Sequence, residues 1–493
     1  MRGFGVANTD RNSFFVLHFM LDQDRGSVGL GIFNSPDHMR EVADKIEEKL
    51  RDNEATPGKE EASGLDSVAK DFFEQFIAML DLLPMGIERT GLLRSVIIQD
   101  CVTDHIIPHG TTLKADGIAK IYEVPYPLLT RVNRQVTRAI RQTHSLGIVP
   151  SISLLGLVSQ FDGFLGRLLR KIYELNPNLI RNIETRVSVN EVLASGSFDQ
   201  FRDTVIDQEV DRVLRMSHKD HIEYFEKLFK TEIASQISDW NGFLEVFERR
   251  NLYAHAAGRV SRTYLQNVPK ENAPELGSEL PITSEYMARA TGLLLEVGLK
   301  LFHIICRTKS LKHHMRDADK ALIDQTYELL VHEHYSVARG LLDLSLDPKL
   351  GIADPISRIV LSVNKAICYS NTGDSASVTE ILKDFEEMPL DARYKIPILA
   401  VLGKNDAACE MLRAQSSDQI RMQELLDWPA FRSLHGDPQF REIIAKKFPD
   451  DFKLYSDVVG RPRSSAEDPG GEAAGSEDPS EATLDINGRG NEL

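Results

Sequence analysis

Apolar residues recur at intervals of three and four along most of the chain, which is the spacing of amphipathic helices. The clearest segment covers residues 152–175, where Leu154, Leu157 and Phe161 begin a long apolar stripe. We predict further helices at 67–82, 90–101, 189–193, 198–216, 219–229, 240–256, 260–265 and 284–307. The pattern therefore predicts a mainly all-α protein.

The first 150 residues follow this pattern less clearly, and we treat 1–150 as a region of unclear fold with at most a few strands. A strand is expected at 14–21, followed by a turn rich in glycine (Gly26, Gly29, Gly31). A helix capped by Ser35 should reach residue 50, and 52–64 reads as a polar loop. Prolines 125 and 127 should interrupt the next stretch.

Residues 131–141 carry arginines on one side of a predicted helix: Arg131, Arg134, Arg138 and Arg141. A solvated helix face explains these charges, and a stripe facing RNA is the alternative.

Residues 317–448 read as helix–turn–helix units, with turns expected at 332–335, 371–374 and 403–406. This pattern resembles tetratricopeptide-type repeats, in which pairs of helices stack into an array. Residues 427–440 resemble a closing segment that covers the last apolar face. Such arrays recruit proteins, so a protein partner is expected here. Residues 461–493 form an acidic tail that should be disordered, because it has little apolar surface to bury.

Charge and cysteine content narrow the functional classes. The 493-residue chain has 58 basic and 74 acidic residues, a net charge of −16, so it should not coat nucleic acid non-specifically. Four dispersed cysteines favour reduced thiols and a cytoplasmic location. The apolar stretch 13–21 is too short to cross a bilayer, so no membrane association is expected.

The most informative local feature is the sequence ERRNLYAH, which contains Arg250, Asn251 and His255. Asn251 and His255 are four residues apart and share a helix face. Arg250 lies about 140° from His255 at 100° per residue, but its side chain is long enough to reach the same pocket. Further positive charge comes from Arg249, Arg259 and Arg262.

This motif, with the predicted helices around it, resembles the HEPN superfamily of helical bundles, whose members carry R-x4–6-H near the start of a late helix. The resemblance covers residues 151–310. The segment SVNEVLASGSFDQFRDTVIDQEVDRVLRMSHKDHIEYFEKLF resembles the middle helices of the family. Asp162 matches an acidic position that some members use beside the motif.

The resemblance implies metal-independent RNA cleavage at a composite site in a homodimer, leaving 2′,3′-cyclic phosphate ends, in bacterial defence or stress. His255 would act as acid or base, Arg250 would clamp the phosphate, and Asn251 and Asp162 would orient these groups. Arg249, Arg259 and Arg262 would bind RNA. The alternative is a non-catalytic protein that binds RNA or nucleotide through the bundle and proteins through the repeats.

Other chemistry lacks support in the sequence. No histidines, cysteines or acids show metal-ligand spacing, and no phosphate-binding loop, nucleophile elbow or dinucleotide fingerprint is present, so we expect neither metal nor cofactor. Family members regulated by nucleotide transfer carry Tyr two residues after the histidine. Ala257 stands there, so this regulation is not expected.

Overall fold

The computed structural model describes residues 4–9, 12–22, 27–33, 64–116, 119–182, 196–268, 274–347, 351–416, 420–449 and 452. The chain divides into two units, Met1–Ser63 and Gly64–Leu493. The predicted helix at 35–50, the loop at 52–63, the helix at 189–193 and the tail at 461–493 lie outside the described residues.

The first unit contains an antiparallel sheet of three strands in the order β1-β2-β3. These are β1 (Phe4–Thr9), β2 (Asn12–Asp22) and β3 (Ser27–Phe33). The strand predicted at 14–21 is confirmed as the centre of β2. Gly29 and Gly31, which we expected in a turn, pair with β2 as part of β3, and Gly26 lies outside the described residues.

The second unit is built from helices, which confirms the all-α prediction for this part of the chain. Its first helix, α2 (Leu65–Cys101), is 37 residues long and replaces two predicted helices. Pro84 lies inside it and removes one backbone hydrogen bond without ending it. Before Pro84 the helix is buried, and Phe72 stacks on Phe164 with ring centroids 3.9 Å apart.

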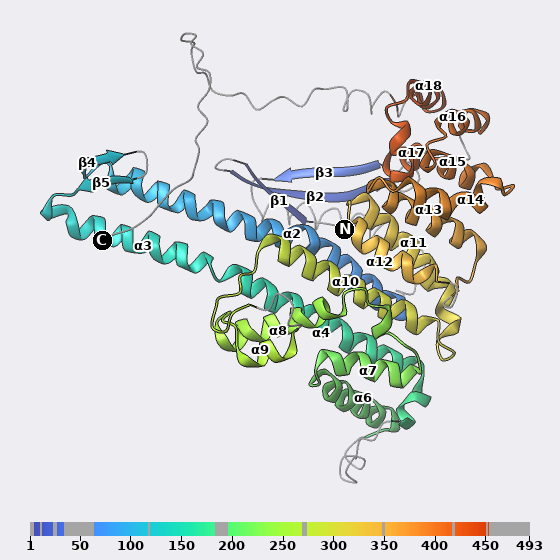
Figure 1. Ribbon diagram of the computed structural model, residues 1–493, viewed down its shortest axis with the longest axis horizontal. Helices are drawn as coiled ribbons and strands as arrows, with labels where there is room; N and C mark the ends of the chain where they lie inside the picture. Colours follow the sequence, from blue (N-terminus) through green and yellow to red (C-terminus); the bar gives the residue numbers. More distant parts are fainter. Residues whose placement is uncertain are drawn as a thin grey trace, which may run out of the picture. The chain divides into compact units, whose positions relative to one another are not determined.

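The part of α2 beyond Pro84 leaves this core and exposes a set of large apolar side chains: Met85, Leu92, Leu93, Val96 and Ile98. A π-helical turn (Val102–Ile106) and a hairpin of β4 (Thr111–Asp116) and β5 (Ala119–Glu123) follow. Pro125 then caps α3 (Tyr126–Leu146), which returns along α2 (Figure 1). We call the segment 85–146 the arm; its hairpin was not predicted.

Helix α3 leads almost directly into α4 (Val149–Leu175), because the linking residues Gly147 and Ile148 both have right-handed helical backbone angles. Taken together, 126–175 is long and apolar enough to span a membrane, with a third of its most apolar window buried. This is weak evidence, since Leu157, Phe161 and Leu168 of α4 are core residues.

The body of the unit is a bundle of α4 with α6 (Phe198–Leu214), α7 (His218–Phe229), α8 (Trp240–Ala256) and α10 (Ser284–Cys306). Side chains cap the last four at Ser197, Ser217, Asp239 and Thr283, which explains why their starts were predictable. Helix α2 packs on α4 and α10, so the core crosses the boundary expected at residue 150.

The remaining helices form antiparallel pairs, as predicted for the repeat-like region. These are α11 (Met315–Val331) with α12 (Tyr335–Ser345), α13 (Pro355–Asn371) with α14 (Ser375–Glu387), and α15 (Ala392–Val401) with α16 (Asn405–Ala414). Their turns coincide with the predicted ones. Helix α17 (Met422–Asp427), a 3-10 turn and α18 (Pro438–Lys447) close the array.

Candidate functional site

The ERRNLYAH sequence lies on α8, whose position in the bundle is set by its apolar face. Phe243, Val246 and Phe247 are buried, and Phe161 of α4 packs against both phenylalanines. The Asp239 side chain accepts a hydrogen bond from the Gly242 amide at 2.8 Å and fixes the start of the helix. The residues between the apolar positions are therefore presented at the rim of the bundle.

Arg250 meets Asp162 at this rim. Its Nη2 lies 3.9 Å from Asp162 Oδ2, and both side chains are about a third exposed. The other oxygen of the carboxylate, Oδ1, accepts a hydrogen bond of 2.7 Å from His218 Nε2. One carboxylate thus holds a guanidinium and an imidazole in one cluster, which we call the Asp162 site. The structure brings together two of the predicted residues, Asp162 and Arg250.

His218 is a member of this site that sequence reasoning missed. It is the first residue of α7, and its ring lies parallel to that of Phe247, with centroids 3.3 Å apart. The His218 side chain is 12% exposed. His218 is 56 residues from Asp162, so no local spacing connects them. The only signal in the sequence was a histidine next to the capping residue Ser217, in the segment that resembles the middle helices of the HEPN superfamily.

His221 lies behind His218, one turn further along α7. Their rings are 4.9 Å apart in an edge-to-face arrangement. His221 is buried, and neither ring nitrogen has a hydrogen-bond partner in good geometry. Burial, followed by the charge of His218, lowers the pKa of His221 to about 4, so this imidazole is neutral at physiological pH.

Asp162, His218 and His221 bring three potential metal-ligand atoms within 4.8 Å of one another, a cluster that the sequence did not predict. A divalent cation here would compete with Arg250 for the Asp162 carboxylate. The guanidinium and the His218 imidazole together suit an anion better. Asp66, His314 and Asp317 form a second such cluster at the start of α2.

Asn251 and His255 are both exposed on α8. Within the described part of the chain, no hydrogen bond or ion pair joins either side chain to the Asp162 site. The predicted catalytic set is therefore divided, with Arg250 and Asp162 joined at the bundle surface and Asn251 and His255 open to solvent beside them. An incoming ligand or a second protomer can reach both histidine and asparagine.

Arg249 has a different environment from the one expected. Its Nε donates to Glu245 Oε1 at 2.6 Å, its guanidinium stacks 3.7 Å from the centre of the Tyr286 ring, and its side chain is only 13% exposed. Glu245 also accepts from the hydroxyls of Tyr264 and Tyr286. We call these four residues the Glu245 network. Arg249 is occupied there and nearly buried, an environment that does not favour the RNA-binding role expected for it.

Arg259 and Arg262 remain exposed beyond the end of α8. Arg259 donates through Nη1 to the Gly277 carbonyl at 3.3 Å, and its backbone pairs with Glu279. Arg262 is the first residue of α9 (Arg262–Asn267). Both side chains are exposed, and their binding of RNA stays a prediction.

A second candidate site is a hollow of about 380 Å³ in the repeat-like region. Tyr327, Tyr394 and Trp428 supply aromatic walls, and Arg393 and Glu424 supply charge at its edge. Trp428 Nε1 donates to Asn364 Oδ1 at 3.1 Å, which fixes the indole. Apolar walls with a few convergent polar groups are typical of ligand and peptide sites.

Comparisons of this chain with protein-family models, with curated proteins and with solved structures find no match.

Proposed function

We propose that this protein is a metal-independent endoribonuclease of the HEPN type that acts as a homodimer in the cytoplasm, in bacterial defence or stress. The observation that carries the proposal is the Asp162 site, where a partly exposed guanidinium and an imidazole share one carboxylate at the surface of the bundle. This set has the charge needed to hold a phosphodiester and a group able to move a proton.

The chemistry needs a base, an acid and a cation. The base removes the proton of a ribose 2′-hydroxyl, whose oxygen attacks the adjacent phosphorus. The bond from phosphorus to the 5′-oxygen breaks, and the acid protonates that oxygen. The products are a 2′,3′-cyclic phosphate and a 5′-hydroxyl end. Arg250 stabilises the charge on the non-bridging oxygens during this exchange.

Two imidazoles are available for the two proton transfers. His218 is held by Asp162, and His255 is exposed one and a half turns beyond Arg250 on α8. A two-fold dimer through the 151–310 bundle would supply both histidines twice, which suits a site completed by a second copy. Sedimentation should show a dimer at micromolar concentration; an active monomer would remove the composite site.

The experiment is cleavage of a 5′-labelled RNA of 30 nucleotides in EDTA. His255→Ala and Arg250→Lys should each lower the rate about 10²–10⁴-fold, since the first removes a proton-transfer group and the second loses the planar fork. His332→Ala is the matched control, because His332 is a half-exposed histidine of the repeat-like region. Cleavage that survives both site variants would end the catalytic assignment.

The second candidate function is a non-catalytic protein that binds RNA through the bundle and a protein through the repeats. The aromatic hollow around Trp428 favours it. In that case His255→Ala and Arg250→Lys leave any trace cleavage unchanged and alter only RNA affinity, measured by fluorescence anisotropy with the same RNA.

A further inference from the structure

Helix α3 of the arm has two contrasting faces. Val132 and Ala139 are its buried residues and face α2. The helix contains four arginines and no acidic residue. At 100° per residue these arginines fall within about 80° of one another, on a side well away from the buried face. We call Arg131, Arg134, Arg138 and Arg141 the arginine stripe.

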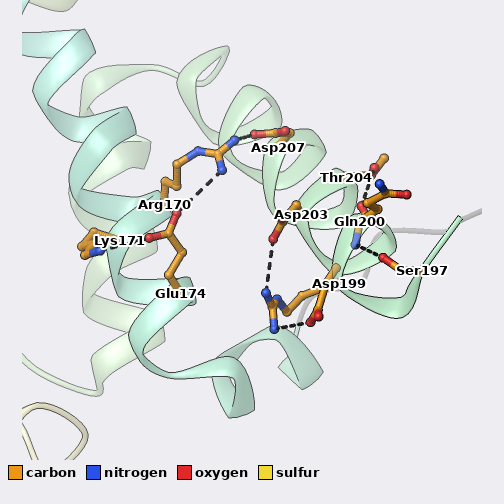
Figure 2. A network of polar contacts seen from close by, with 10 residues as sticks. Arg170, Lys171, Glu174, Ser197, Asp199, Gln200, Asp203, Thr204 and Asp207 are labelled. Carbon is orange, nitrogen blue, oxygen red and sulfur yellow. Dashed lines mark hydrogen bonds and ion pairs between the residues drawn. The ribbon is translucent and has the colours of Figure 1, made fainter. Parts of the chain in front are cut away.

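All four side chains of the stripe are exposed, and none has an acidic partner among the residues that the structure describes. Some arginines of the body have acidic partners. Figure 2 shows Arg170 of α4 paired with Asp207 of α6 and with Glu174. Arg202 has two aspartates beside it. In a chain of net charge −16, four such unpaired arginines on one side of a single helix form a local concentration of positive charge.

Three arginines of the stripe also line one hollow. Arg134, Arg138 and Arg141 border a concave region of about 610 Å³. Ile97 of α2 contributes an apolar wall, and Gln142 and Ser145 add hydrogen-bonding groups. Several guanidinium forks around one hollow fit a ligand that carries repeated anionic groups, such as a phosphate backbone.

The stripe lies on the same helical rod as the Asp162 site. Helix α3 continues into α4 through two residues with helical angles, and Figure 1 shows the two helices running on with little change of direction. Arg141 and Asp162 are 21 positions apart, which corresponds to about 30 Å at 1.5 Å per residue. A linear polyanion can therefore follow the rod between the two places.

We propose that the arginine stripe binds the phosphate backbone of the RNA whose scissile phosphate lies at the Asp162 site. This inference rests on the proposed function and adds to it a second contact region, which selects RNA by length. A stacked single strand rises roughly 3.4 Å per nucleotide, so about nine nucleotides separate the two contacts. Shorter RNA reaches only one of them.

The first test measures binding in full-length protein. The variant R134Q/R138Q/R141Q is compared with R358Q/R413Q/R441Q, which removes the same charge from exposed arginines of the repeat-like region that lie outside the hollow around Trp428. Anisotropy of a labelled 30-nucleotide single-stranded RNA is followed in EDTA from 50 to 300 mM KCl. Loss of three phosphate contacts should reduce the slope of log affinity against log salt by about two and weaken binding at least tenfold at 100 mM KCl.

The control variant should keep the wild-type slope. Equal weakening in both variants, or an unchanged slope in the stripe variant, overturns the inference. Vesicles containing 30% phosphatidylserine are the second probe, because an arginine-rich amphipathic helix can also bind an anionic membrane. Vesicle binding that depends on the stripe while RNA affinity and slope stay unchanged likewise overturns it.

The length test separates this inference from the proposed function. The stripe variant should lose at least tenfold in kcat/KM on the 30-nucleotide RNA and less than twofold on a 6-nucleotide RNA, which spans roughly 20 Å. Equal losses on both lengths overturn the length selection. If the wild type cleaves neither RNA, the proposed function fails, and the salt slopes alone still support or overturn the stripe as an RNA-binding surface.

Discussion

Two carboxylates lie close to the same helix and have opposite surroundings. Glu245 is nearly buried and receives hydrogen bonds from Arg249, Tyr264 and Tyr286. Asp162 is about a third exposed and holds His218 and Arg250. The Glu245 network is closed, since the side chains of Glu245 and Arg249 are only 11% and 13% exposed. In the Asp162 site, the side chains of Asp162 and Arg250 are partly exposed and can contact a ligand.

The adjacent arginines of α8 illustrate the same difference. Arg249 and Arg250 are neighbours in sequence, so composition and charge treat them alike. Their side chains leave the helix about 100° apart, and one packs on Tyr286 while the other reaches the bundle surface. The Glu245 network should therefore determine the stability of the fold, and the Asp162 site should determine the activity. This comparison gives four predictions.

The largest effect is expected from Glu245→Ala. This change leaves Arg249 inside the protein without its counter-charge and two tyrosine hydroxyls without their acceptor. We expect a loss of about 3–5 kcal/mol in the free energy of unfolding, measured by urea denaturation. Asp162→Ala is the comparison and should cost less than about 1 kcal/mol. Equal losses would mean that both clusters are structural.

The second prediction concerns a substitution that should lower activity and leave stability almost unchanged. Asp162→Asn keeps the size of the side chain but removes the charge that holds Arg250 and orients His218. Cleavage of the 30-nucleotide RNA should fall about 100-fold, equivalent to about 2.7 kcal/mol of transition-state stabilisation. The melting temperature should stay within about 2 °C. Full activity in this variant would show that Asp162 has no part in the reaction.

The third prediction concerns the pH dependence of stability. It tests His221, which lies behind His218 of the Asp162 site. The folded-state pKa of His221, about 4, is lower than its ordinary value of 6.5, so the unfolded chain binds the proton first. Stability is therefore complete above about pH 6.5 and falls as the pH drops toward 4. Between pH 7.5 and pH 5, His221 should account for a loss of about 2 kcal/mol.

His221→Leu should remove that part of the pH dependence in urea unfolding. Burial also lowers the pKa of His303 to about 3, so a residual loss toward acid remains in the variant. His303 therefore serves as an internal reference. His303→Leu should remove only the loss of stability that comes from His303 and leave the loss that comes from His221. An unchanged pH profile in His221→Leu would show that this imidazole is not kept neutral in the folded protein.

The smallest effects are expected at the exposed arginines near the end of α8. Arg259→Ala and Arg262→Ala should each change stability by less than about 0.5 kcal/mol, because these side chains are exposed. Each should reduce the salt slope of RNA binding by about 0.7 if it contacts one phosphate. Anisotropy titrations measure this, and unchanged slopes in both variants would exclude them from the RNA-binding surface.

Sequence patterns predicted the helices of the body well, because capping residues and apolar periodicity are local. Helix α8 occupies the predicted range from Trp240 to Ala256. Helix α2 was predicted as two helices, at 67–82 and 90–101, whereas the helix continues through Pro84 and its first half packs on α4 and α10. Tertiary contacts decided that case.

The candidate site was only half predictable for the same reason. Arg250 was identified from its motif, and Asp162 from the family resemblance. The partnership of Asp162 with His218 depends on how α4 and α7 pack, and no sequence spacing encodes it. The inward turn of Arg249 depends on Tyr286, 37 positions along the chain, so charge alone assigned it to the wrong face.

The end of α8 has a consequence for how this sequence can vary during evolution. Ala257 closes the helix in a left-handed conformation, and Gly258 follows with φ of +77°. A Cβ atom at Gly258 would lie 2.8 Å from the Tyr253 ring, whose hydroxyl donates to the Leu280 carbonyl. Selection should therefore tolerate glycine alone at 258, and drift at Tyr253 should be limited to residues that fill the same space. The turn that ends the helix is therefore constrained by packing, independently of any constraint that activity places on the motif before it.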